Sequence, residues 1–184
     1  MNFTIENKGD VSNEFLKRGI KDFKGACDFI SKLPYKRNRN KKSLLCVFED
    51  KAGTCSTKHS TLRKLALEND RNDIKLILGI FKMDAEYTKK IENTLNEYGL
   101  EYIPEAHNYL KIVNEYYYFT NQNSQYSDLE DKILEESEIE YNEIYEEKIK
   151  THKLFFEKWI QDKPQFDLEK IWEVREKCIF DLQN

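Results

Sequence analysis

Cys55 is the residue whose type and setting most clearly predict chemistry. It follows the glycine at position 53 and stands at the start of a helical pattern, among polar neighbours. The N-terminus of a helix presents unpaired N–H groups and a positive potential, which favour a thiolate and lower a cysteine pKa from about 8.5. The same N–H groups can hold a developing oxyanion. We therefore predict that Cys55 is a nucleophile.

The other three cysteines have ordinary structural interpretations. Cys27 and Cys178 fall on the apolar faces of predicted helices, and Cys46 lies in an apolar run, where a free thiol behaves as a small buried hydrophobic group. No CxxC spacing occurs, which argues against a zinc ribbon or a disulfide framework. We expect no metal and no cofactor.

A thiolate nucleophile needs a proton shuttle, and the chain has three histidines. His107 begins a segment that alternates with period two, which predicts a strand, and strand ends often present catalytic groups. His59 shares a helix face with Cys55, but two ligands alone make a weak metal site. His152 lies within an amphipathic helical pattern. His107 is therefore the candidate base, with a purely structural histidine as the alternative.

Periodicity along the chain predicts an α+β fold with a small antiparallel sheet. The expected elements are helices over residues 12–33, 54–69 and 87–98, a buried strand over 74–83, a hairpin over 107–120, a long helix over 129–160 and a last helix after Pro164. Gly99 is placed to end the third of these helices.

Charge is unevenly distributed about a net value of −4. Residues 128–147 hold ten acidic side chains against Lys132, whereas residues 32–42 hold six basic side chains and no acid. We expect the C-terminal helices to pack on the core with their acidic turns toward this basic loop, within one chain or across a homodimer. Because the whole chain is acidic and no recognised motif accompanies the loop, nucleic-acid binding is not expected. No apolar run is long enough to span a bilayer, so we expect no membrane partner and a cytoplasmic protein.

The motifs Gly53-Thr-Cys55-Ser, His107-Asn-Tyr-Leu-Lys-Ile and Tyr118-Phe-Thr120, with a buried strand between the first two, resemble the transglutaminase-like superfamily of papain-type folds. The resemblance covers residues 12–123. It implies a core helix that carries the nucleophile Cys55 and packs on a small sheet, with His107 as general base and acid. Residues 1–125 would form this core, and residues 126–184 a C-terminal helical pair packed on it.

The third catalytic position departs from the family pattern, because Tyr118 stands where the family has an aspartate. A two-residue turn at Asn114-Glu115 would place Tyr118 on the face of His107, together with Thr120 and Gln122. A one-residue shift of register would turn Asn121 there instead. The third member stays open between Tyr118 and Asn121. A tyrosine can hydrogen-bond an imidazole but supplies no negative charge.

The function implied by the resemblance is acyl transfer or amide hydrolysis through a Cys55 thioester, with a peptide or protein as substrate. Two alternatives remain. One is a catalytically inactive relative that acts as a protein-interaction module, and the other is a purely structural domain in which Cys55 is one more buried thiol. Tyr35 is the candidate upstream oxyanion donor.

Overall fold

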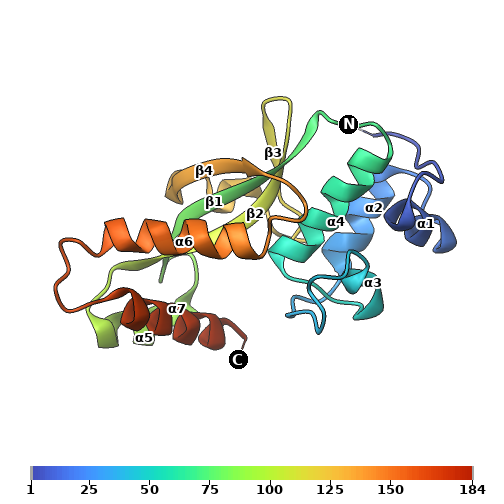
Figure 1. The fold of residues 1–184 in the computed structure, drawn as a ribbon. Helices are drawn as coiled ribbons and strands as arrows, with labels where there is room; N and C mark the ends of the chain where they lie inside the picture. Colours follow the sequence, from blue (N-terminus) through green and yellow to red (C-terminus); the bar gives the residue numbers. More distant parts are fainter. Residues whose placement is uncertain (1, 184) are drawn as a thin grey trace.

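A four-stranded antiparallel sheet with the strand order β3-β2-β1-β4 forms the centre of the protein. The computed structural model describes residues 2–183, whose fold is drawn in Figure 1. The strands are β1 (Ile74–Asp84), β2 (Tyr102–Ile112), β3 (Glu115–Tyr117) and β4 (Ile133–Ile139). The α-helices are α1 (Asp10–Lys17), α2 (Phe23–Lys32), α3 (Cys46–Glu49), α4 (Cys55–Glu68), α5 (Glu92–Tyr98), α6 (Glu146–Trp159) and α7 (Leu168–Gln183), and short 3-10 helices are η1 (Lys89–Ile91), η2 (Tyr126–Asp128) and η3 (Glu130–Lys132). The predicted α+β class is confirmed.

The sheet has one fully paired central strand and one partly open edge. β1 pairs with β2 along its whole length, from Ile74 opposite Ile112 to Asp84 opposite Tyr102, and with β4 on its other side. β1 is buried on both faces, as its apolar sequence predicts. β3 pairs only with residues 110–112 of β2. The residues that follow β3 make no further strand pairing with β2, although Thr120 lies 3.3 Å from His107.

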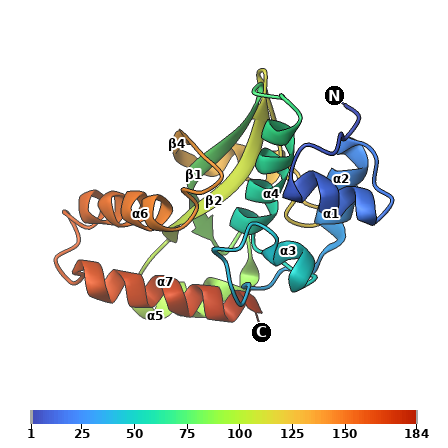
Figure 2. The same cartoon turned by 45° about the vertical axis from the view of Figure 1, so that its right-hand side comes forward.

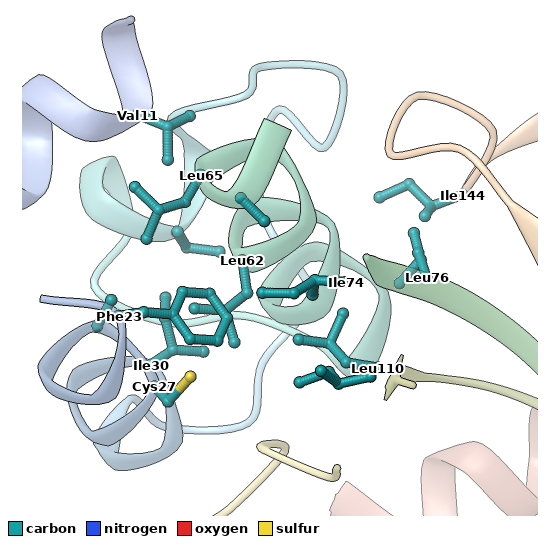
Figure 3. Packing of buried hydrophobic residues seen from close by; sticks show 14 of the residues in the cluster. Val11, Phe23, Cys27, Ile30, Leu62, Leu65, Ile74, Leu76, Leu110 and Ile144 are labelled. Atoms are coloured by element: carbon teal, nitrogen blue, oxygen red, sulfur yellow. The ribbon is translucent and has the colours of Figure 1, made fainter. Parts of the chain in front are cut away.

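Helices cover both faces of the sheet and create two apolar cores (Figures 1 and 2). On one face, α1 to α4 pack on the side chains of Leu76 and Leu110, as Figure 3 shows for part of this core. On the other face, α5, α6 and α7 pack on Phe81 and Tyr109. Burial of each large apolar side chain contributes roughly 1.5–3 kcal/mol, so both helical layers are integral to the fold.

The N-terminal helical region is divided. Instead of one helix over residues 12–33, α1 ends before Gly19, which has a positive φ of 75°, and α2 begins after Asp22. Asp22 caps α2 by accepting a hydrogen bond from the N–H of Gly25 at 2.8 Å. The expectation of one continuous helix is wrong because a glycine turn and a capping residue interrupt the apolar period. Gly99, by contrast, ends α5 in the left-handed conformation as predicted.

The expected long helix over residues 129–160 is also wrong. Its first part is the edge strand β4, and only Glu146–Trp159 is helical. In a helix, like charges such as Glu136 and Glu140 repel one turn apart, whereas an extended chain rises about 3.3 Å per residue and therefore holds these two side chains about 13 Å apart. Charged side chains on an edge strand also discourage pairing with another chain. Residues 126–184 thus supply the helical pair α6 and α7 and, in addition, a strand of the central sheet.

The acidic segment has other partners than the basic loop. Glu138 pairs with Lys75 of β1 at 2.9 Å, and no ion pair within residues 2–183 joins residues 128–147 to residues 36–42. Arg37 of the basic loop pairs instead with Glu176 of α7 at 3.1 Å. The expected contact between the loop and the C-terminal helices therefore exists, but α7 makes it. Across residues 2–183, the helices are too short or too polar for any of them to cross a membrane.

Candidate active site

The first turn of α4 is held in place by its own cap and by the preceding loop. Thr54 is the N-cap, and the side chain of Thr57 accepts a hydrogen bond from the N–H of Thr54 at 3.0 Å. Residues Tyr35 and Gly53 form an isolated parallel β-bridge. A side chain at Gly53 would meet Thr57 Oγ1 at 2.9 Å and Val47 Cγ1 at 3.0 Å, so only glycine fits there. This packing fixes Cys55 as the first residue of the helix.

Asn38 ties the basic loop to this helix start. Its side-chain oxygen accepts a hydrogen bond from Thr57 Oγ1 at 2.8 Å, and its amide donates to the carbonyl of Ala52 at 2.9 Å. Sequence analysis missed Asn38, because a polar residue in a basic loop carries no periodic signal. The loop consequently forms one wall beside Cys55.

Cys55 is buried, with 4% of its surface exposed, and lines a cavity of about 520 Å³. Burial alone would raise the pKa of its thiol. The positive charges of His107 and Lys148, a hydrogen bond with His107 and one with the backbone of Asn108 outweigh burial and lower the pKa to about 5. Cys55 is therefore a thiolate at neutral pH.

The other cysteines behave in the opposite way. Burial raises the pKa of Cys46 to about 11 and that of Cys178 to about 12, and it also raises the pKa of Cys27. All four cysteines are free and buried. Cys55 is thus distinguished by charged partners and not by exposure.

His107 lies in the middle of β2 and not at the start of a strand as expected, because the strand already begins at Tyr102. The His107 ring has two well-defined neighbours. Its Nε2 is 3.3 Å from Thr120 Oγ1, and the ring of Tyr118 packs edge-on against its ring with centroids 4.8 Å apart. His107 is also among the groups that lower the pKa of Cys55, so the imidazole neighbours both the thiol and the Thr120 hydroxyl.

The register of the hairpin explains why Thr120 holds this position. The turn lies at Val113-Asn114, one residue earlier than expected, with Ile112 opposite Glu115. Continuing this register sets Thr120 across from His107. The side-chain face is the expected one, because moving a two-residue turn by one position shifts the pairing by two residues.

Of the two residues considered for the third position, the structure brings only Tyr118 to the imidazole. Tyr118 packs on the ring of His107 and lies parallel to the ring of His59, with centroids 5.8 Å apart. Asn121 is exposed and makes no contact with the imidazole. The hydroxyl that meets the imidazole belongs to Thr120.

Two side chains of α4 hold the segment that carries Thr120. Lys58 Nζ donates to the carbonyls of Thr120 at 2.6 Å and Leu33 at 2.5 Å. His59 Nε2 accepts from the N–H of Phe119 at 2.8 Å, so Nδ1 carries the proton and donates to the carbonyl of Cys55. Burial lowers the pKa of His59 to about 3, which keeps it neutral. His59 is thus a positioning residue beside Cys55.

Lys148 of α6 is the functional candidate that sequence analysis missed. Its Nζ lies 3.8 Å from Cys55 Sγ, 2.8 Å from Ser56 Oγ and 3.0 Å from Asn108 Oδ1. Ser56 Oγ donates to Asn108 Oδ1 at 2.9 Å, and the Asn108 amide donates to the carbonyl of Ile77 at 3.0 Å. This network fixes the Lys148 ammonium beside the sulfur. Nothing in the spacing of a lysine 93 residues from Cys55 could have indicated it.

Glu105 and His152 have structural partners near the same cavity. Glu105 forms a two-pronged ion pair with Arg175 of α7, at 2.6 and 2.7 Å. Burial would raise the pKa of Glu105, but Arg175 lowers it to about 2. His152 Nε2 lies 2.8 Å from the carbonyl of Pro104, and burial lowers its pKa. Glu105 therefore links β2 to α7 and does not orient His107.

The cavity lies between the start of α4, the loop around Tyr35, and helices α6 and α7. The ring of Tyr35 is partly exposed, and burial of its hydroxyl, reinforced by the charges of Cys55 and Glu105, raises its pKa well above 10. The Tyr35 hydroxyl therefore stays protonated in the cavity that Cys55 also lines, and it can donate a hydrogen bond there. No group of three or more metal-ligating side chains gathers within residues 2–183.

Comparisons of this chain with protein-family models, curated proteins and solved structures find no match in any of the three. The argument for function therefore depends on the geometry and electrostatics of the site.

Proposed function

We propose that this protein is a cysteine-dependent acyl-transfer enzyme of the transglutaminase-like type, which hydrolyses or transfers an acyl group through a Cys55 thioester. One observation carries the proposal. The Cys55 thiol at the start of α4 lines a cavity and has its pKa lowered to about 5 by His107 and Lys148 against the effect of burial. Such perturbed groups in clefts are typical of nucleophiles.

The first half of the reaction forms the thioester. The Cys55 thiolate attacks the carbonyl carbon of the acyl donor, a C–S bond forms, and the carbonyl electron pair moves to oxygen. N–H groups at the start of α4, the Lys148 ammonium and the Tyr35 hydroxyl are available to stabilise this oxyanion. The tetrahedral intermediate then expels the leaving group, which takes a proton from the His107 imidazolium.

The second half releases the acyl group. Water or an amine attacks the thioester carbonyl while neutral His107 accepts its proton, and the thiolate leaves as the C–S bond breaks. Thr120 accepts a hydrogen bond from His107 Nε2 and orients the ring. A threonine hydroxyl carries no charge, so the imidazolium receives less stabilisation than from a carboxylate. The lowered Cys55 pKa depends correspondingly more on Lys148.

Trapping of the acyl-enzyme tests the proposal. p-Nitrophenyl acetate should release a burst of p-nitrophenol equal to the enzyme concentration and add one acetyl group at Cys55, read by peptide mass. Cys55→Ser should abolish both signals. Cys178→Ser is the matched control, because that thiol is buried with a raised pKa, and it should behave as wild type. A folded wild-type protein that gives neither burst nor acetylation would support a non-catalytic interaction module instead.

A further inference from the structure

The cavity beside Cys55 has an excess of positive charge. Its charged lining residues are four cations, Arg37, Lys41, Lys148 and Arg175, and two carboxylates, Glu105 and Glu176. Both carboxylates are already paired. Glu105 binds Arg175, and Glu176 binds Arg37 and Arg175.

Lys41 and Lys148 are left with no carboxylate within ion-pair distance among residues 2–183. Lys148 contacts Cys55, Ser56 and Asn108 at the inner end of the cavity. Lys41 is exposed at the outer end, where its ammonium lies 5.5 Å from the ring centroid of Tyr145. Lys148 faces the sulfur of Cys55 at 3.8 Å, so Lys41 is the lining cation that has no anionic partner among residues 2–183.

The two lysines have different neighbours and therefore different uses. Lys148 faces the sulfur, where a reacting carbonyl would sit. Lys41 stands on the loop side, where the rest of an acyl donor would extend past Tyr145. A partly enclosed cavity screens charge less than open water does, so a substrate cation would be repelled and an anion attracted.

We propose that the acyl donor is an acidic peptide, with a side-chain carboxylate near the reacting carbonyl that Lys41 binds. This inference rests on the proposed function, because it assigns the substrate class of the same site. The aromatic ring of Tyr145 supplies apolar contact beside that carboxylate, and Lys41 acts as a specificity determinant.

A pair of isosteric affinity reagents tests the inference. N-iodoacetyl-aspartate amide and N-iodoacetyl-asparagine amide differ by one negative charge, and both alkylate the same Cys55 thiolate. The fraction of Cys55 present as thiolate affects both second-order rate constants equally, so it drops out of their ratio. We expect the aspartate reagent to react about two- to fivefold faster with the native protein, as for a partly exposed ion pair. The corresponding lysine reagent should react slowest.

Two variants assign the preference to its residue. Lys41→Gln should bring the ratio of aspartate to asparagine rates close to that of the urea-unfolded protein. The neighbouring Lys42, which is exposed and does not line the cavity, provides the matched control, and Lys42→Gln should keep the wild-type ratio. A native ratio no higher than the unfolded one, or an unchanged ratio in Lys41→Gln, would overturn the inference. Slow labelling of Cys55 by all reagents, with the ratio preserved, would contradict the proposed function and leave the anion preference established.

Discussion

At the scale of single residues, the side chains around the sulfur of Cys55 determine its reactivity. Burial raises the pKa of Cys55 and nearby charge lowers it, and the charges of His107 and Lys148 outweigh burial. In Cys27 and Cys178, where burial has no comparable opponent, the thiol pKa is raised. The sequence located Cys55 from its helix-start position and His107 from its strand, because both signals are local.

Thr120 and Lys148 illustrate what local patterns can and cannot predict. Alternation along the hairpin predicts that Thr120 lies on the same face as His107. That Thr120 lies directly opposite His107 follows only from the observed position of the turn. Lys148 could not be predicted, because its contact depends on how α6 packs against the start of α4 and against β2. Neither Tyr118 nor Asn121 hydrogen-bonds the imidazole. The group that does so is the hydroxyl of Thr120.

Removal of the Thr120 hydroxyl should weaken the acylation step. Thr120→Val keeps the shape of a buried side chain but cannot accept the hydrogen bond from His107. A lost hydrogen bond of about 0.5–1.5 kcal/mol corresponds to a burst roughly two- to tenfold slower. Thr120→Ser should restore most of the rate, because it keeps the hydroxyl. A burst in Thr120→Val as fast as in wild type would show that the hydroxyl does not position His107.

At the scale of secondary-structure elements, α4 and β2 create the site together. β3 stops pairing after residue 117, the following residues bring Thr120 to His107, and Ser56 of α4 hydrogen-bonds Asn108 of β2. α4, β1 and α5 were predictable from periodicity, a cap and a glycine stop. β4 was not, because its acidic side chains match a solvated helix face as well as an edge strand. The segment forms a strand because β1 has an edge, on the side away from β2, with which it can pair.

The contact between β2 and α7 should make stability depend on acid pH. Arg175 lowers the pKa of Glu105 to about 2 from an ordinary value of 4.5, so the ionised carboxylate stabilises the folded state. This contribution, about 3 kcal/mol, is fully present above pH 4.5 and is lost as the pH falls toward 2. Urea unfolding between pH 7 and pH 3 should show the loss in wild type.

Glu105→Gln is the variant that isolates this carboxyl. It should be destabilised by roughly 3 kcal/mol at pH 7, because Arg175 loses its main buried partner, and its stability should fall less steeply below pH 4.5. Equal pH dependence in the two proteins would show that another carboxyl is responsible.

At the scale of the whole molecule, the C-terminal helices supply part of the candidate site. α6 brings Lys148 to the sulfur, α7 brings Arg175 to Glu105, and both helices contribute side chains to the second apolar core. The resemblance to a known family covers only residues 12–123, so it predicts no role for these helices. The structure makes them one wall of the cavity.

A mutation that creates a cavity in the core beneath α6 should therefore destabilise the entire fold. Phe156 is fully buried between His152 and Trp172, and Phe156→Ala should lower the free energy of unfolding by about 3–5 kcal/mol. The exposed Leu154 is the control on the same helix, and Leu154→Ala should change stability by less than about 0.5 kcal/mol. Thermal unfolding should remain a single transition. Separate transitions for the core and for α6–α7 would contradict this integration.

The pH dependence of Cys55 alkylation by iodoacetamide, followed by peptide mass, tests the central claim most directly. In wild type the rate should rise with a midpoint near pH 5 and stay level through neutral pH, because the thiolate is already formed. In His107→Ala the midpoint should move upward toward the ordinary cysteine value near 8.5, since the imidazolium no longer stabilises the thiolate. A wild-type midpoint near 8.5, or a midpoint that His107→Ala leaves unchanged, would contradict the pairing of Cys55 with His107.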